Sequence, residues 1–496
     1  MALGLTPQEI VDKNEYQLLV KADHWKRVPL SKVATVQNGF AFKSALFERE
    51  EGMPLIRIRD ITKSETEHRF NGAYDESYVV RKGDILIGMD GDFTVARWQG
   101  EDALLNQRVC RIKLISDGYD EKFLFICLQP YLDAIHAETS SVTVKHLSSR
   151  TIGQIPLPLP SVVEQRDIVA KIDTLFSELD KGIESLKTAR EQLKVYRQAV
   201  LKYAFEGKLT AQWREENKDK LESPEKLLTR VPEPSQPRGG RGASIEVIEG
   251  VGALAVNKPK KSIPSGWAWT PLMRVARQET GHTPSRKHPE YWGGNEYWVG
   301  IVDARLNHGQ VIQDTRQKIT PEGLSNSSAR TLPAGTVCLS RTASVGYVCI
   351  LGKPMATSQD FATWTCSEAL DQKYLMYAIM AEGDEIRRFG KGTTHTTIYF
   401  PEIRALHIAL PSMEEQKVIV SYVEEKLQQT DIMLSELNSQ AARADVLRHA
   451  ILKRAFSGQL TTKDSNHTAL GKHLTDIGWD NSSESPSNLR MNRMET

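Results

Sequence analysis

Two stretches of the chain carry the apolar periodicity of a long helix that packs against another helix. In residues 160–210, apolar and small residues alternate at gaps of three and four, which is the heptad pattern of a coiled coil. Pro160 precedes the pattern and Gly207 follows its last turn, as expected for the two ends of a helix. The pattern predicts a single helix of roughly 66 Å, much longer than the average globular helix.

The second stretch, residues 411–461, aligns with the first at a constant offset of 251 residues without a gap. Glu164 and Gln165, for example, align with the identical pair Glu415 and Gln416. Because each helix needs a partner and one chain carries both, we predict that the two pack on each other. The expected packing residues are Ile168, Ile172, Leu175, Leu179, Leu186 and Leu193 in the first helix and Ile419, Val423, Leu427, Leu434, Leu437 and Ile451 in the second. Tyr196, Val200 and Tyr203 continue the first seam.

A globular domain is predicted in front of each long helix, and the same internal repeat relates the two domains. The identical positions include Trp25 and Trp267, Gly39 and Gly281, and Gln107 and Gln359. Short apolar runs between Gly-rich turns, such as 84–89 and 108–115, predict strands, while 121–132 and 372–389 have helical spacing. The mixture predicts an α+β fold, with the two tryptophans as core anchors at the start of each domain.

The domain boundaries follow from these patterns and from local composition. They are an N-terminal helical extension (1–22), a first globular domain (23–158), a first long helix (159–214), a linker (215–262), a second globular domain (263–409), a second long helix (410–465) and a disordered tail (466–496). The linker is rich in Pro, Gly and Ser, which favours an exposed joint. Thr6, Pro7 and Glu9 predict a capping box that opens a short helix in the extension.

Composition narrows the class of protein. The net charge of the 496 residues is +1, so bulk charge does not announce a nucleic-acid binder, and the first long helix carries eight acidic and eight basic residues between Glu164 and Glu206. No run of about 18 apolar residues occurs. Five cysteines without a CxxC motif favour a reduced, cytoplasmic protein with buried thiols. We find no metal-ligand spacing, phosphate-binding loop or catalytic cluster, and we interpret Asp90 to Asp92 as an acidic turn.

Several phrases in a fixed order resemble the specificity subunit of type I restriction-modification systems, over about residues 20–465. They are NGFAFKS (38–44), IPLPLPSVVEQRDIVAKID (155–173), RQAVLKYAFEGKLTAQWREEN (197–217), GHTPSRKHPEYWGG (281–294), NSSARTLPAGTVCLSRTASVG (326–346) and LHIALPSMEEQKVIV (406–420). The resemblance implies a non-catalytic DNA reader with two target recognition domains, each contacting one part of a split DNA sequence, held apart by two antiparallel helices. Because the two domains differ in side chains, the target is expected to be asymmetric.

The same resemblance implies partners. Two methyltransferase subunits would clasp the long helices and two restriction subunits would lie outside them, so that adenine-N6 methylation and cleavage of unmodified DNA are performed by the partners. S-adenosylmethionine, ATP and Mg are then expected on the partner subunits, with no cofactor in this chain. The expected location is the prokaryotic cytoplasm, without contact to a membrane.

Base readout needs Arg, Lys, Asn, Gln, Ser or Thr on loops that can enter a groove of DNA. The candidates in turn-rich segments or at strand ends of the first domain are Lys43, Arg57, Arg59, Asn106, Gln107 and Lys145. Those of the second domain are Thr283, Ser285, Arg286, Lys287, Arg341, Ser344, Gln359, Thr394, His395 and Thr396. For any one of them, a solvated surface charge or a local turn hydrogen bond is an equally good interpretation.

Two alternatives remain open at this point. The chain could serve a methyltransferase alone, which its neighbouring genes would distinguish. It could also be a coiled-coil scaffold whose end domains bind carbohydrate or protein, which predicts no DNA affinity in the presence of any partner.

Overall fold

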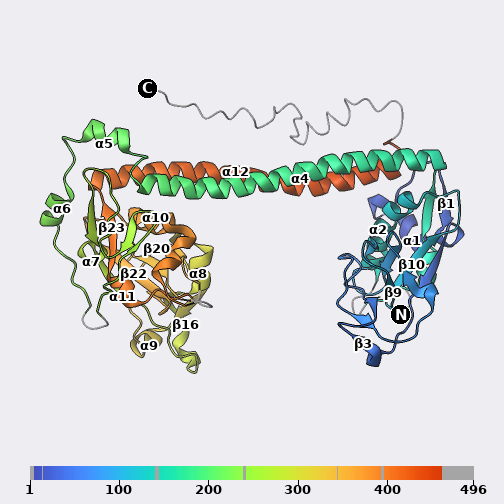
Figure 1. Ribbon diagram of the computed structural model, residues 1–496, viewed down its shortest axis with the longest axis horizontal. Coiled ribbons are helices and arrows are strands. Elements are labelled where there is room, and N and C mark those ends of the chain that lie inside the picture. Colours follow the sequence, from blue (N-terminus) through green and yellow to red (C-terminus); the bar gives the residue numbers. More distant parts are fainter. Residues whose placement is uncertain are drawn as a thin grey trace. The chain divides into compact units, whose positions relative to one another are not determined.

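The computed structural model describes residues 5–13, 15–139, 145–237, 242–342, 344–392 and 396–460 (Figure 1). The chain divides into two compact units. The first comprises Met1–Ser185 and Ser439–Thr496, and the second comprises Leu186–Asn438. Each unit therefore holds one globular domain together with part of both long helices. The tail predicted at 466–496 lies outside the described residues.

Among the described residues, three sheets and three helices build the first domain. The central sheet has the order β2 (Ala34–Asn38), β10 (Val109–Leu114), β7 (Ile85–Gly88) and β8 (Val95–Arg97), and all of its neighbours are antiparallel. The second sheet has the order β3 (Phe47–Glu48), β5 (Arg69–Phe70), β4 (Met53–Ile56), β9 (Ala103–Leu105) and β6 (Val79–Val80). All four residues of β7 are buried, which explains why its sequence is continuously apolar rather than alternating.

Further elements close the first domain. They are β1 (Lys26–Pro29) paired with β11 (Pro156–Leu159), the helices α1 (Pro7–Lys13), α2 (Glu121–Glu138) and α3 (Ser149–Gly153), and the short 3-10 turns η1 (Gln17–Leu19), η2 (Leu30–Lys32), η3 (Ser44–Leu46) and η4 (Glu76–Tyr78). The predicted capping box opens α1: the backbone N–H of Thr6 donates to Glu9 at 2.6 Å and that of Glu9 donates to the Thr6 hydroxyl at 3.3 Å.

The second domain repeats this plan with additional strands. Its central sheet has the order β15 (Ala276–Thr280), β22 (Phe361–Cys366), β19 (Val337–Ser340), β20 (Val348–Leu351) and β17 (Val311–Ile312). A second sheet has the order β18 (Gln317–Ile319), β16 (Trp292–Val299) and β21 (Ala356–Thr357), and a third has the order β12 (Ile248–Glu249), β13 (Leu254–Val256), β23 (Leu406–Leu410) and β14 (Ala268–Pro271). The helices are α7 (Leu272–Val275), α8 (Ile301–Leu306), α9 (Pro321–Ser325), α10 (Gln372–Glu382) and α11 (Phe400–Arg404), with η5 (Pro289–Tyr291) and η6 (Gly383–Phe389).

Strand register confirms the internal repeat that the sequence predicts. In the first domain Ala34 of β2 pairs with Leu114 of β10, and in the second domain Ala276 of β15 pairs with Cys366 of β22. At the other end of the same sheets, Gly88 pairs with Val109 as Ser340 pairs with Phe361. The two domains therefore display equivalent backbone positions, so their side chains can be compared one by one.

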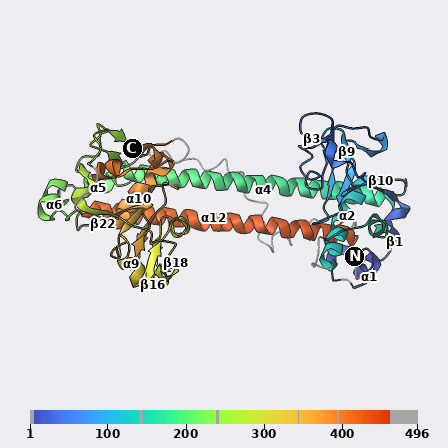
Figure 2. The same ribbon diagram turned by 90° about the horizontal axis from the view of Figure 1, so that it is seen from below.

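Two helices of 44 residues, α4 (Val162–Phe205) and α12 (Met413–Phe456), confirm the predicted long helices. In the first unit the start of α4 shares a core with the end of α12, and Arg448 pairs with Asp180. In the second unit the end of α4 shares a core with the start of α12, and Arg197 pairs with Asp431. Within each unit the helices therefore run antiparallel and side by side (Figure 2).

Burial supports most of the predicted helix packing. The buried members of the set are Ile168, Ile172, Leu179, Ile419, Val423, Leu427 and Ile451, and the partly buried ones are Leu175, Leu186, Leu193, Leu434 and Leu437. The prediction that Tyr196 and Tyr203 belong to the helix seam is wrong, since their side chains are 48% and 51% exposed. The last turns of α4 instead bury Leu201, Ala204 and Phe205, because these turns pack against the second domain as well as against α12.

The segment predicted as an exposed joint, 215–262, is also corrected in part. It contains α6 (Pro224–Arg230), which follows α5 (Ala211–Asn217), as well as the strands β12 and β13. The strand β13 is fully buried and pairs with β23. Glu382 of α10 fixes the turn before it by accepting the backbone N–H groups of Val251, Gly252 and Leu254 at 2.7, 2.9 and 3.3 Å, while burial raises the pKa of its carboxyl. The high Pro and Gly content of residues 215–262 led to the prediction of an exposed linker, although the segment includes the short apolar strand β13.

A buried glutamine joins each globular domain to its long helix. The Gln165 amide donates to the carbonyls of Gly118 and Pro160 at 3.1 and 2.9 Å and accepts the N–H of Asp120 at 2.7 Å. Gln416 repeats all three bonds, with the carbonyls of Ala369 and Pro411 at 3.1 and 3.2 Å and the N–H of Asp371 at 2.8 Å. Both glutamines are completely buried.

The neighbouring glutamate and the predicted tryptophan anchor complete the joint. Trp25 is 3% exposed and its indole N–H donates to Glu164 at 3.1 Å; Trp267 is 7% exposed and donates to Glu415 at 3.0 Å. The interpretation of both tryptophans as core anchors is therefore confirmed. All five cysteines are free, and four of them are buried. In the described part of the chain, no helix has the length and apolarity needed to cross a membrane.

We predict that Gln165→Leu lowers the free energy of unfolding by about 2–4 kcal/mol, because it leaves one N–H and two carbonyls without partners in a buried site. Urea unfolding measures the loss, and amide exchange should localise it to the start of α2. The exposed Gln192 on the same helix gives the matched control, since Gln192→Leu should change the value by less than about 0.5 kcal/mol. Equal effects of the two substitutions would contradict the assignment of Gln165 as the joint.

Candidate functional site

Four loops of the first domain converge at one end of its central sheet. They are residues 39–40, 89–91, 106–108 and 145–147, which we call the first loop face. Backbone hydrogen bonds tie them together: Phe40 donates to Leu105 at 2.9 Å, Met89 to Arg108 at 3.0 Å and Leu147 to Met89 at 2.7 Å. The loop face is therefore a fixed platform that follows the strand ends of β2, β7 and β10.

The second domain builds the same platform from residues 281–283, 341–342, 357–360 and 396–398, which we call the second loop face. His282 donates to Thr357 at 2.9 Å, Arg341 to Asp360 at 2.8 Å and Ile398 to Arg341 at 2.9 Å. These bonds match those of the first domain one for one. Met89 thus corresponds to Arg341, so equivalent backbone carries different side chains.

One glycine in each domain makes this convergence possible. A Cβ atom on Gly39 would lie 2.1 Å from the carbonyl oxygen of Asn106, and one on Gly281 would lie 1.9 Å from that of Thr357. Any side chain at these positions would push two loops apart. The identical glycines noted in the sequence repeat are thus explained by backbone contact at the loop face.

Part of the predicted set in the first domain lies on the loop face. Asn106, Gln107 and Lys145 belong to it, and Lys43 follows Phe40 by three residues. Arg57 and Arg59 instead follow β4 of the second sheet, where the Arg57 guanidinium lies 2.5 Å from the His68 ring. No hydrogen bond or ion pair recorded among the described residues brings these two arginines to the loop face.

Three predicted residues of the second domain meet on its loop face. The Thr283 hydroxyl donates to the Gln359 side chain at 2.6 Å, and Arg341 donates to the Gln359 carbonyl at 3.0 Å. Thr396 belongs to the fourth loop of the same face, residues 396–398. Thr394 and His395 lie outside the described residues. The Arg341 guanidinium stacks on the Phe400 ring at 4.3 Å, and burial lowers its pKa.

Arg341 and Gln359 border a cleft of about 800 Å³ in the second domain. Its lining includes Arg330, Arg341, Gln359, Thr397, Tyr399 and Arg404. Among the described residues, the Nε atom of Arg341 is buried without a hydrogen-bond acceptor. The cleft therefore combines guanidinium and amide donors with an exposed aromatic ring, which are the groups that recognise base edges and faces.

Ser285, Arg286 and Lys287 lie apart from this cleft, beside the sheet that contains β16. The Arg286 guanidinium stacks on Trp292 at 3.6 Å and donates to the Gln317 side chain at 2.8 Å. Lys318 and Lys353 lie over the Tyr297 ring at 4.5 and 5.0 Å on the same sheet. This cationic surface suits backbone phosphates, because its charged groups are positioned by aromatic contacts.

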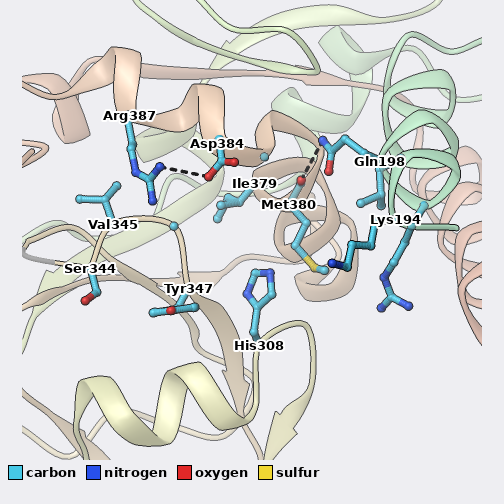
Figure 3. Close-up of a pocket in the computed structure, with 14 residues that line it drawn as sticks. Lys194, Gln198, His308, Ser344, Val345, Tyr347, Ile379, Met380, Asp384 and Arg387 are labelled. Atoms are coloured by element: carbon cyan, nitrogen blue, oxygen red, sulfur yellow. Dashed lines mark hydrogen bonds and ion pairs between the residues drawn. The ribbon is translucent and has the colours of Figure 1, made fainter. Parts of the chain in front are cut away.

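Ser344 lines a separate cleft of about 540 Å³ between α4 and the second domain (Figure 3). On the helix side, the Gln198 amide donates to the carbonyl of Ala381 at 2.7 Å, at the end of α10. On the domain side lie His308 and the ion pair of Arg387 with Asp384 at 3.1 Å. Gln198 thus fixes the domain on α4 close to the loop that carries Ser344.

Sequence reasoning missed a charged cluster on the first loop face. Asp90 lies 2.8 Å from Arg108 and 2.6 Å from His146. The interpretation of Asp90 as part of an acidic turn overlooked these partners, because His146 is 56 residues away in the chain. The available signal was the position of Arg108, directly after the candidate residue Gln107.

No group of three or more His, Cys, Asp or Glu side chains within the described ranges is arranged to hold a metal ion. Comparison with known proteins gives a clear family match. Residues 22–188 and 264–442 each match the type I restriction modification DNA specificity domain.

Relatives and solved structures agree with this match. The chain is 32% identical over 472 residues to the type I restriction enzyme EcoBI specificity subunit of Escherichia coli, covering 93% of this chain and 92% of that protein. It is 23% identical to the EcoDI specificity subunit of Escherichia coli, covering 88% and 89%. A structure solved to explain complex assembly and conformational transition of the type I R-M system has the same fold, with a TM-score of 0.62, 18% identity and coverage of 88% of this chain and 99% of that one.

We predict that Gly39→Ala and Gly281→Ala each lower the free energy of unfolding by more than about 2 kcal/mol, because the new methyl group overlaps a carbonyl of the neighbouring loop. Gly242→Ala is the control, since nothing lies within 4 Å of its added Cβ. Urea unfolding with amide exchange at the loop face measures both. Unchanged protection of the Phe40 and His282 amides, which donate to the carbonyls of Leu105 and Thr357, would show that the loops do not depend on these glycines.

Proposed function

We propose the function of this chain from one premise: the chain belongs to the type I restriction modification DNA specificity family and is a specificity subunit. It reads an asymmetric, bipartite DNA target. Each loop face contacts one half-site, and the base pairs between the half-sites are not read. Two similar readers in one chain suit two half-sites at a fixed spacing.

The observation that carries the proposal is that equivalent backbone positions of the two loop faces carry different side chains. At three matched positions the first loop face has Met89, Arg108 and His146, where the second has Arg341, Asp360 and Thr397. These side chains differ in charge and in their hydrogen-bond donors and acceptors. Because base pairs are told apart by donor and acceptor patterns in the major groove, different side chains select different half-sites.

The reaction belongs to partner subunits. In our proposal two methyltransferase subunits bind this chain and methylate adenine at N6, and two restriction subunits cleave unmodified DNA. S-adenosylmethionine, ATP and Mg are bound by those partners. Exposed apolar side chains on the long helices support a docking surface for the methyltransferase; in the second unit Val195, Ile432 and Met433 are 71%, 64% and 55% exposed.

We predict that expressing this chain with its methyltransferase partner produces one split, asymmetric motif that carries N6-methyladenine in genomic DNA. Single-molecule sequencing of cells with and without this gene measures it. A strain that has the methyltransferase alone is the control and should lack the motif. Identical methylation in the two strains would contradict the role of the chain as reader.

We also predict that deleting one heptad from both α4 and α12 shortens the unread spacer by about three base pairs, because seven helical residues span roughly 10 Å and a base pair about 3.4 Å. The sequences of the two half-sites should stay the same. Deleting the heptad from one helix only should abolish assembly, because it breaks the register of the pair. Altered half-sites in the double deletion would show that the helices do not set the spacing.

A further inference from the structure

The charged cluster on the first loop face has the geometry of a prepared base-reading arginine. The Asp90 side chain is 17% exposed and bridges two groups, the Arg108 guanidinium at 2.8 Å and the His146 ring at 2.6 Å. The Arg108 side chain is 56% exposed. A mostly buried carboxylate therefore holds one edge of a guanidinium whose remainder faces solvent.

The cluster stands at the position where the second domain has its cleft. The backbone matches described above place Asp90 at the position of Thr342 and His146 at that of Thr397, and both threonines line the cleft. In the second domain the Thr342 hydroxyl donates to Asp360, the counterpart of Arg108, at 2.7 Å. The same pair of loop positions thus interacts in both domains, with an arginine at the tip in one and an aspartate in the other.

The free donors of Arg108 define its ligand. Its Nη1 atom is engaged by Asp90, and in the described part of the chain no other partner of the guanidinium is recorded. Further N–H groups of the fork remain, and two parallel N–H donors match the O6 and N7 acceptors that guanine presents in the major groove. Because Asp90 fixes the side chain in advance, less conformational entropy is lost when the contact forms.

We propose that Arg108 is a specificity-determining residue that reads a guanine in the half-site of the first domain, and that Asp90 is its positioning residue. This inference rests on the proposed function and adds to it the residue and the base. A phosphate contact by the same arginine would strengthen binding to every sequence equally, whereas a guanine contact affects one base pair.

The test uses the complex of this chain with its methyltransferase partner and duplexes that carry the motif found by sequencing. Each guanine of the motif is replaced in turn by 7-deazaguanine, which lacks the N7 acceptor. For the wild-type complex, one replacement in one half-site should weaken binding on the order of tenfold. For Arg108→Gln the same replacement should have no further effect, and other bases should be accepted at that position.

Three variants separate the roles. Arg108→Lys keeps the charge but loses the fork, so it should lose discrimination at the same guanine while keeping its affinity for DNA that lacks the motif. Asp90→Asn should weaken discrimination at that guanine only. Arg81→Gln is the control, since Arg81 is a comparably exposed arginine of the same domain, paired with Glu76 at 2.9 Å, and should leave the motif unchanged.

Several outcomes would overturn the inference. One is a wild-type complex that binds every deazaguanine duplex equally well, and another is an Arg108→Gln complex that keeps the sensitivity. Equal weakening on all sequences would assign Arg108 to a phosphate, and failure of both Arg108 variants to assemble would assign it to folding. A wild-type complex without any methylated motif would instead contradict the proposed function itself, so the two failures are distinguishable.

Discussion

The buried glutamine at the start of each long helix is the interaction on which the rest of the structure depends. Gln165 and Gln416 each satisfy two carbonyls and one N–H that the junction between domain and helix would otherwise leave without partners. An unpaired polar group in a buried site costs more free energy than the hydrogen bond itself contributes. The joint therefore fixes the orientation of each loop face relative to its own helix, and reading a base at a defined place requires that rigidity.

One arginine on each loop face is held by a neighbouring side chain of the same domain. Arg108 is held by Asp90, and Arg341 is stacked on Phe400 close to Asp360. Such groups give up part of the long-range attraction to phosphates and retain directional hydrogen bonding. Directional hydrogen bonds distinguish base pairs, whereas attraction to phosphates does not.

The sequence predicted the elements that follow from periodicity and from repetition. The heptad pattern predicted both long helices, and the aligned tryptophans predicted the core anchors of the two domains. Strand-end positions placed Gln107, Arg341 and Gln359 on the loop faces, and their contact with DNA stays a prediction. It did not give contacts that form only when distant loops meet, such as Asp90 with His146. It also placed Tyr196 and Tyr203 in the helix seam, because a linear heptad does not register that the last turns of α4 pack against a domain.

The strand β13 has a consequence for how the second domain can be moved between proteins. Because β13 covers one side of β23, a fragment that starts at the apparent end of the linker would present β23 as an open edge, which is a template for aggregation. It would also remove the three backbone donors of the Glu382 carboxylate. The transferable unit of recognition therefore begins before β12, inside a stretch whose composition reads as spacer. A recombination event or an engineered exchange that places the boundary at the end of the Pro- and Gly-rich segment would separate β13 from the core of the second domain.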